Sequence, residues 1–385
     1  KLIKNGIILT PEKTFHNQAI LVEQDRIAAI GPPEKFVDGG EVEEIDAKSN
    51  FISPGFIDAH THGADGVDFM TATEQEMGSA LEFIAAHGVC RVMPTLASAQ
   101  QEDLLDMVGR YSRLDHGSMP GAGLLGIHLE GPYLSVEKRG AQPLKALRDP
   151  DIGEMEKVIE ASGDSISMVT LAPERRGALD LIRSLVDQGI VVSAGHTTAS
   201  YEQMGAAKDA GLTRVAHLFH RMSPLHHRQP RPVGAALTLP EIFTEVIFDR
   251  IHLSPVVVDL ALRSKGMGKV VLITDSSQAT GLPDGEYIRP GDRKIIVRDG
   301  VARLENGSLA GSTLCMNQAV RNAVHELGLS IGEAVKLASL NAARSLGIAG
   351  DFGSLVPGKK ADIIIHDEEI SVALTMVDGQ IRYQS

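Results

Sequence analysis

Histidines and carboxylates recur in this sequence at the ends of short apolar segments, where they could bind a metal ion. Six residues stand in such places: His60, His62, Glu130, His196, His217 and Asp275. Imidazole nitrogens and carboxylate oxygens, without a thiolate among them, suit Zn²⁺, Fe²⁺ or a similar divalent ion. Water bound to such an ion becomes a nucleophile near neutral pH. The pattern therefore indicates hydrolytic chemistry, provided that the fold brings the six side chains together.

The apolar segments that precede these residues predict eight strands. They cover residues 56–62, 89–96, 124–131, 166–173, 190–197, 214–219, 244–251 and 270–277. Helix-like stretches separate most of them, and apolar strands that alternate with helices are typical of a parallel sheet covered by helices. Eight such units over about 220 residues favour an α/β fold, a (β/α)8 TIM-type barrel. An open, doubly wound sheet is the alternative.

In a barrel of this kind the C-terminal ends of all strands meet at one face, where active sites lie. His60 and His62 would point to the same side of their strand, because side chains alternate with a period of two. A single histidine at a strand end is usually a hydrogen-bonded core residue, but six metal-type residues at five strand ends predict a site for one or two ions. Glu130 is the natural bridging carboxylate for two ions. Asp275 is the candidate proton acceptor and donor, with a plain ligand or helix cap as the alternative.

The two ends of the chain have a different pattern, with short β-type segments and polar turns. Neither end is long enough to form an independent core. We therefore expect one small β-sandwich domain made from residues 1–53 with 347–385. The barrel would occupy residues 54–346, with a strand-rich insertion at about 285–311.

Composition excludes several classes of function. The chain has 37 Lys and Arg against 50 Asp and Glu, a net charge of −13, which argues against nucleic acid as a partner. No apolar run approaches the ~18 residues of a membrane span. A proline interrupts the opening residues before they could form the apolar region of a signal peptide. Cys90 and Cys315 cannot form a disulfide framework, so a cytoplasmic location is expected.

Loops after the predicted strands carry further polar candidates. Arg228 and Arg231 lie in SPLHHRQPRP at residues 223–232, and His252 follows the seventh strand. Arginine forks suit phosphate or carboxylate groups, although solvated loop cations are the alternative. Gln142 could donate to a substrate carbonyl oxygen, with an ordinary loop role as the alternative.

Seven segments together resemble one family. They are FISPGFIDAHTHG, GIHLEGPYLSVEKRGAQP, SAGHTTASY, AHLFHRMSPLHHRQP, LITDSSQATGLPDGEY, LAGSTLCMNQAVRN and GSLVPGKKADIII. In order, and along essentially the whole chain, they are similar to the N-acetylglucosamine-6-phosphate deacetylases, a branch of the amidohydrolase superfamily. The resemblance implies a metal-dependent barrel with a terminal β-sandwich, in a cytoplasmic homodimer. It also implies deacetylation of an amino-sugar phosphate, N-acetyl-D-glucosamine 6-phosphate, in amino-sugar catabolism.

The resemblance further implies residue roles. It makes Glu130, His196 and His217 the principal ligands, and it allows a two-metal site in which His60, His62, Asp275 and also Glu130 contact the added ion. Asp275 is the implied catalytic acid and base. Arg228 is implied to bind the phosphate of a substrate that lies in the neighbouring subunit. The expected substrate-binding set is Ala141, Gln142, His220, Arg221, Arg228, His252, Leu309, Ala310 and Gly311.

Three positions depart from the family pattern around the sugar and phosphate. His220-Arg221 stands where Asn-Ala is usual, Gln229-Pro230-Arg231 replaces Glu-Pro-Gly, and Arg250 replaces a glycine. Amide hydrolysis is therefore expected, while a different N-acyl amino sugar, phosphorylated or not, stays an alternative substrate. A cyclic amide hydrolase and a non-enzymatic binding protein are further alternatives. The HLEGP motif and the LHHR cluster argue against the first, and the retained Glu130 and Asp275 argue against the second.

Overall fold

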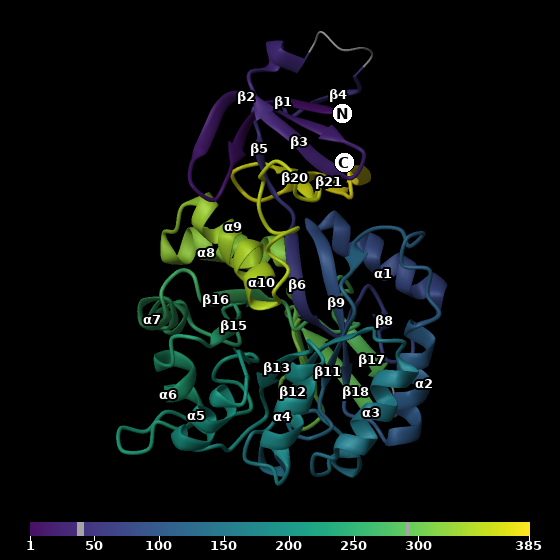
Figure 1. Ribbon diagram of the computed structural model, residues 1–385, viewed down its shortest axis with the longest axis vertical. Coiled ribbons are helices and arrows are strands. Elements are labelled where there is room, and N and C mark those ends of the chain that lie inside the picture. The colour runs from purple at the N-terminus through teal and green to yellow at the C-terminus, as the bar shows by residue number, and fades with distance from the viewer. Residues whose placement is uncertain (37–41, 290–292) are drawn as a thin grey trace.

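The computed structural model describes residues 1–36, 42–289 and 293–385 and places a barrel beside a terminal β-sheet (Figure 1). The barrel strands are β6 (Phe56–Thr61), β9 (Val89–Ala97), β11 (Ile127–Glu130), β12 (Ile166–Leu171), β13 (Val191–Ala194), β14 (Arg214–Val215), β15 (Phe243–Ile247) and β16 (Val270–Ile273). They are parallel neighbours in this order, and the short β10 (Gly123–Leu124) extends the sheet beside β9. Each overlaps one predicted strand, which confirms the barrel.

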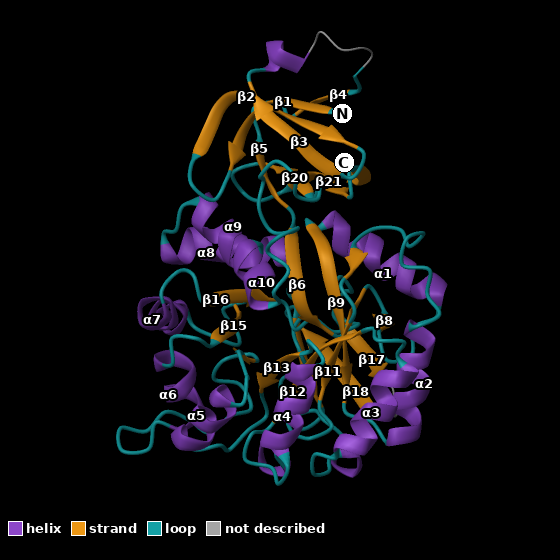
Figure 2. Cartoon of the chain, in the orientation of Figure 1, coloured by secondary structure: helices purple, strands orange, loops and turns teal. Residues whose placement is uncertain are grey.

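Helices surround this barrel on the outside (Figure 2). They are α1 (Glu74–Ala86), α2 (Gln101–Tyr111), α3 (Ile152–Ala161), α4 (Ala178–Asp187), α5 (Tyr201–Asp209), α6 (Arg231–Thr238), α7 (Pro255–Lys265), α8 (Met316–Leu327), α9 (Ile331–Ala338) and α10 (Leu340–Ser345), with 3₁₀ turns η2 (Val136–Lys138) and η3 (Leu144–Ala146). A further 3₁₀ turn, η1 (Pro33–Phe36), lies against the terminal sheet. Each helix must bury one apolar face; in α4 that face contains Leu181, Ile182 and Leu185. In the described part of the chain, no helix has the length and apolar character needed to cross a bilayer.

Both faces of the barrel strands are buried, which explains why the strands are apolar along their whole length. All nine residues of β9 and all four of β16 are buried. Backbone bonds from Asp275 N to His60 O (2.8 Å) and from His62 N to Ser276 O (2.8 Å) join the end of β6 to the segment after β16. These bonds close the barrel at the end where the predicted metal ligands lie.

The chain termini share one further sheet. Its strands are β1 (Leu2–Leu9), β2 (Thr14–Glu23), β3 (Arg26–Gly31), β4 (Glu44–Asp46), β5 (Phe51–Pro54), β20 (Ile363–His366), β21 (Val372–Val377) and β22 (Gln380–Gln384). Residues from both ends of the chain enclose a separate apolar core, which includes Ile20, Ile52 and Ile363. Backbone bonds between Ile27 and residues 358–359 bring the two ends of the sheet together.

Two small sheets flank the barrel mouth. One pairs β7 (Gly63–Ala64) with β8 (Val67–Asp68), and the other contains β17 (Gly285–Arg289), β18 (Arg293–Arg298) and β19 (Val301–Leu304). Arg303 on β19 forms an isolated antiparallel bridge with Leu309. This pairing directs the segment that follows β19 back toward Asp275, where Ser312 N donates to the Asp275 carbonyl oxygen at 2.8 Å.

Candidate metal centre and active site

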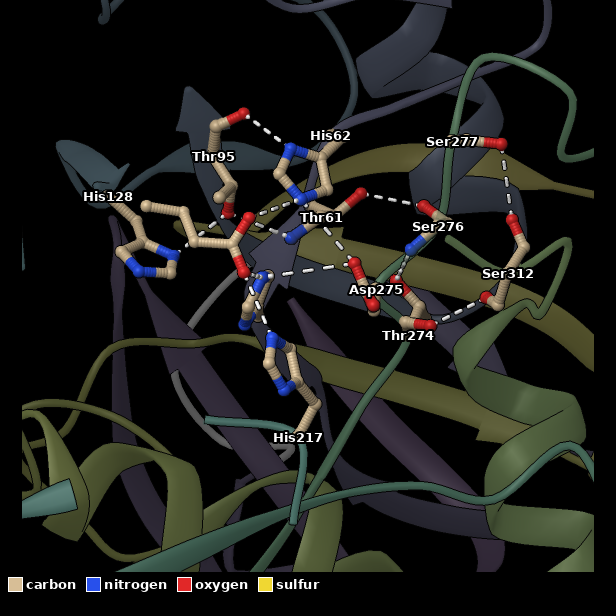
Figure 3. Close-up of polar contacts among 12 residues, drawn as sticks. Thr61, His62, Thr95, His128, His217, Thr274, Asp275, Ser276, Ser277 and Ser312 are labelled. Atoms are coloured by element: carbon tan, nitrogen blue, oxygen red, sulfur yellow. Dashed lines mark hydrogen bonds and ion pairs between the residues drawn. The ribbon is translucent and has the colours of Figure 1, made fainter. Parts of the chain in front are cut away.

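The six predicted metal-type side chains meet at the C-terminal end of the barrel strands; Figure 3 shows His62, His217 and Asp275 among them. Glu130 is the centre of the group, because the Nε2 atoms of four histidines face its carboxylate. Its Oε1 lies 3.0 Å from His196, 2.9 Å from His217 and 3.5 Å from His60, and its Oε2 lies 3.4 Å from His62. Asp275 Oδ1 lies 3.4 Å from His62 Nε2. The structure thus brings together all six residues that sequence patterning selected.

In three of these histidines Nδ1, the ring nitrogen that does not face Glu130, contacts an oxygen acceptor. The Nδ1 contacts are His62 to Thr95 O (3.1 Å), His196 to Lys138 O (2.8 Å) and His60 to the Glu245 carboxylate (2.9 Å). A carbonyl or carboxylate oxygen only accepts, so each neutral imidazole carries its proton on Nδ1 and turns the lone pair of Nε2 inward. The Nε2 lone pairs of these histidines are therefore free to coordinate a metal ion near Glu130.

Backbone strain accompanies the placement of three of the six residues. His196, His217 and Asp275 adopt positive φ angles of 47°, 27° and 47°. Residues other than glycine rarely occupy this region, which costs about 1–3 kcal/mol each and persists only where surrounding contacts enforce it. The bond from Asp275 N to His60 O is one such contact. The sharp turns let side chains just beyond the strands point back across the barrel mouth.

Electrostatics favour positive charge at this point. Burial acts to raise the pKa of Glu130, but the charge of His196 and hydrogen bonds from the histidines outweigh it and hold that pKa well below its usual range. Burial likewise opposes ionisation of Asp275, yet the hydrogen bond from His62 and the nearby imidazole charges lower its pKa. Although burial acts to lower them, the pKa values of His62 and His217 are raised by the same carboxylates. The ionised carboxylates of Glu130, which is buried, and of Asp275, which reaches the cavity, would therefore favour a bound cation.

The residues fit a divalent ion by donor type and by geometry. Two groups, His60–Glu130–His217 and His60–His62–Asp275, each place their ligand atoms within 4.8 Å of one another. The His60 Nε2 atom is buried and has no hydrogen-bond partner among the described residues. A buried polar atom without a partner is costly, and a metal ion would satisfy it.

A cavity of about 430 Å³ opens above the centre. Of the predicted substrate-binding residues, those that line it are Ala141, Gln142, His220, Arg221, His252, Leu309 and Gly311. Two others do not line it. The side chain of Ala310 is 0% exposed and packs in the core of the β17–β19 sheet, and Arg228 lines a separate hollow on the surface. Asp275 also lines the cavity, so it can contact both the centre and a bound molecule.

Gln142 contacts Glu130 directly. Its Nε2 donates to Glu130 Oε2 at 2.5 Å, and its Oε1 accepts from Ser98 N at 2.8 Å. The side chain is 5% exposed. With both ends of its amide engaged, Gln142 fixes the orientation of Glu130, a role that sequence patterning did not suggest.

His220 and His252 form one wall of the cavity. Their rings meet edge to face with centroids 4.8 Å apart, and His252 Nδ1 lies 2.6 Å from Asp249 Oδ2. Burial, with the charges of His252 and His217, lowers the pKa of His220 to about 3. His220 is therefore neutral at physiological pH and presents an uncharged ring to the cavity.

The arginines that depart from the family pattern have different surroundings. Arg221 lines the cavity, whereas Arg231 lines the outer hollow beside Arg228. Arg250 lies on the surface and pairs with Glu326 at 2.6 Å. Of these three arginines, only Arg221 therefore faces the candidate substrate site of its own chain.

Sequence patterning missed three residues around the site. Arg303 lines the cavity, the His128 ring meets the His60 ring edge to face with centroids 4.7 Å apart, and the Glu245 carboxylate contacts His60 Nδ1. Two signals were present in the sequence. His128 lies two residues before Glu130 and thus on the same side of β11, and Glu245 is a lone carboxylate inside an apolar strand.

Comparison with known proteins identifies the family. The model of the Amidohydrolase family matches residues 51–382. The chain belongs to the amidohydrolase family. It is accordingly a metal-dependent amide hydrolase, and the two ligand groups described above supply the expected site for a divalent ion.

Named relatives cover almost the whole chain. The N-acetylgalactosamine-6-phosphate deacetylase of Escherichia coli O157:H7 is 37% identical over 374 residues, 97% of both chains. The N-acetylglucosamine-6-phosphate deacetylase of Bacillus subtilis (strain 168) is 35% identical over 391 residues, 100% of this chain and 97% of that protein. A mutant N-acetyl-D-glucosamine-6-phosphate deacetylase from Mycobacterium smegmatis, solved in complex with N-acetyl-D-glucosamine-6-phosphate, superposes with a TM-score of 0.92 at 35% identity, covering 100% and 99% of the two chains.

Proposed function

We propose that this amidohydrolase removes the acetyl group of N-acetyl-D-glucosamine 6-phosphate, releasing acetate and D-glucosamine 6-phosphate, in amino-sugar catabolism. The observation that carries the proposal is the position of Asp275 and the four-histidine Glu130 centre at the floor of one cavity, with Arg221 at its wall. The deacetylase relatives named above, similar along the whole chain, support the choice of substrate.

The side chains can perform the proton transfers of amide hydrolysis. A divalent ion bound here would lower the pKa of water and polarise the amide carbonyl. Asp275 has a lowered pKa and is 14% exposed at its side chain, so it is an ionised base that can reach the cavity. It accepts the proton of the attacking water and donates it to the departing amine. Gln142 keeps Glu130 in place throughout.

We further propose that the centre holds Zn²⁺ or Fe²⁺, with up to two ions per chain. Imidazole and carboxylate ligands support these metals. Two ligand groups, His60–Glu130–His217 and His60–His62–Asp275, support this number, because they offer enough nitrogen and oxygen atoms for two ions. Elemental analysis of protein purified with excess metal tests this: two ions per chain are expected, and a maximum of one would contradict the two-ion form.

We also propose a cytoplasmic homodimer in which Arg228 reaches the substrate phosphate in the other subunit. Its position outside the cavity of its own chain supports this arrangement. Mixed dimers of Arg228→Ala and His217→Ala chains provide a test, because one site in each mixed dimer would keep both residues. Random pairing should then restore roughly a quarter of wild-type activity. No restoration in proven mixed dimers would exclude the shared site. Both cysteines, Cys90 and Cys315, are free, which supports a reducing compartment.

N-acetyl-D-galactosamine 6-phosphate is the second candidate substrate. The similarity to the Escherichia coli O157:H7 protein and the substitution of His220-Arg221 in the cavity wall favour it. Acetate release from both sugars, each with and without the 6-phosphate, decides between them. The glucosamine derivative is expected to have the higher kcat/KM. A higher value for the galactosamine derivative would replace the proposed substrate, and no acetate from any of the four would refute the proposed function.

A further inference from the structure

A buried ion pair lies directly behind the metal centre. Glu245 on β15 is 1% exposed, and its Oε1 accepts from Arg214 Nη2 on β14 at 2.6 Å. The Arg214 side chain is 0% exposed and also contacts the Ser345 hydroxyl. The other oxygen of Glu245 lies 2.9 Å from His60 Nδ1 and accepts from the His217 backbone N–H at 3.2 Å. One carboxylate thus touches a ligand side chain and the backbone of a second ligand.

We propose that Glu245, neutralised by Arg214, is a positioning residue that equips His60 to bind the second metal ion. This inference rests on the two-ion centre of the proposed function. The carboxylate accepts the Nδ1 proton of His60, which leaves the Nε2 lone pair facing Glu130 and Asp275 at 3.5 and 3.8 Å. A carboxylate behind a histidine ligand fixes its tautomer and ring orientation and raises its basicity.

Arg214 is a necessary part of this arrangement. A carboxylate buried this deeply would be costly without a partner, and its pKa would rise toward the neutral acid. Arg214 supplies that partner, because its Nη2 donates to Glu245 Oε1 at 2.6 Å. Glu245 therefore remains an acceptor, and Arg214 leaves its second oxygen free for His60.

The effect on the two ions should be unequal. His60 belongs to both ligand groups, one with Glu130 and His217 and the other with His62 and Asp275, and the latter group would hold the second ion. His196 is held independently by the Lys138 carbonyl oxygen, and it contacts Glu130 without help from Glu245. Loss of Glu245 should therefore weaken the ion on the β6 side more than the ion held by Glu130, His196 and His217, of which only His217 contacts Glu245, through its backbone N–H.

Glu245→Gln is the sharpest perturbation because it changes the acceptor and preserves the shape. Arg214 can only donate, so the amide oxygen of the glutamine would turn to Arg214. Its NH₂ group would then face His60 Nδ1 and force the proton onto Nε2, where it blocks the metal. The double variant Arg214→Met/Glu245→Met removes both charges at similar volume, a change that buried ion pairs commonly tolerate. It provides the same test if the single variant does not fold.

Asp362→Asn is the matched control. Asp362 forms the same kind of buried pair with Arg91, at 2.6 and 2.9 Å, and it contacts no histidine. Stripped proteins would be titrated with ¹¹³Cd²⁺, with ion affinities measured by titration and ¹¹³Cd NMR used to distinguish the two sites. The wild type and the control should give two signals. Glu245→Gln and the double variant should keep one signal, with the affinity for the second ion reduced about 10- to 100-fold.

Two outcomes would overturn the assignment. One is unchanged affinity for both ions in a folded Glu245→Gln or double variant, and the other is an equal loss of both ions. A single signal in the wild type has a different meaning, because it would refute the two-ion centre itself and this inference with it. The wild-type spectrum thus tests the proposed function, and the difference between variant and control tests Glu245.

Discussion

Replacing Arg221 with alanine should weaken catalysis on a phosphorylated sugar far more than on the same sugar without phosphate. Arg221 lines the cavity, and no ion pair engages it within the described residues. Its side chain packs on the loop after β11, so closely that a Cβ atom on Gly140 would meet Arg221 Nε at 2.6 Å. The guanidinium is therefore held at the cavity by contacts of its own chain and is available to an anion.

The expected magnitude follows from the type of bond. A charge-assisted hydrogen bond to phosphate contributes about 1.5–3 kcal/mol. Loss of this contribution corresponds to a reduction of about 10- to 200-fold in kcat/KM for the 6-phosphate. The unphosphorylated sugar has no anion to lose, so its kcat/KM should change by less than about twofold. In the wild type, omission of the phosphate should cost at least as much as the substitution, because Arg303 also lines the cavity.

Acetate release measures both substrates in one assay, and metal content should be the same in every variant. Arg250→Ala is the matched control, since Arg250 is an exposed arginine paired with Glu326 away from the cavity. It should change neither activity by more than about twofold. Raised salt should reduce the phosphate preference, because screening weakens exposed ion pairs.

Equal wild-type turnover of the sugar with and without its phosphate would refute this reasoning. It would mean that the substitutions at His220 and Arg221 have adapted the cavity to an uncharged amide. An equal loss on both substrates in Arg221→Ala would also refute it, because Arg221 would then act on the catalytic centre or on the fold rather than on the anion.

Three further predictions concern the metal and the fold. His196→Ala and His217→Ala should each abolish activity and reduce bound metal, and full occupancy in elemental analysis of both would contradict their assignment as ligands. Asp362→Ala should destabilise the chain by about 1–3 kcal/mol in urea unfolding, because the buried Arg91 would lose two hydrogen bonds and keep, among the described residues, only Asp378 as an ion-pair partner, and a loss under about 0.5 kcal/mol would contradict this. Burial lowers the pKa of His366, so the unfolded chain takes up a proton first as pH falls below about 6.5. Its contribution should reduce stability there by up to about 1.4 kcal/mol per pH unit, and His366→Gln should flatten the stability curve between pH 7 and 5; identical curves would exclude the effect.

Much of the fold follows from local pattern. Parallel strands buried on both faces must be apolar along their length, so each barrel strand is visible as a short apolar segment between helices. The first polar residues after such strands lie at one face of a barrel, and this rule alone places Glu130, His196, His217 and Asp275 together. The period of two along a strand adds His62 to His60. The metal centre was thus predictable because one regular element positions each ligand.

The surroundings of the centre depend on contacts that no local pattern encodes. Whether an arginine faces the cavity is decided by loop backbones and distant partners: Arg221 packs on Gly140 and faces inward, whereas Arg250 turns out to Glu326. The same holds for Gln142, whose amide is fixed between Ser98 and Glu130.

The Arg214–Glu245 ion pair next to His60 shows most clearly what a local sequence pattern cannot predict. Glu245 is 185 residues from His60 in the sequence, and only the closure of the barrel brings the two side chains within 2.9 Å. The sequence by itself determined which elements form and where their polar ends meet, because periodicity and burial are local properties. The tertiary structure alone decided which side chain supports which ligand, because a hydrogen bond depends on distances and directions that the whole fold sets.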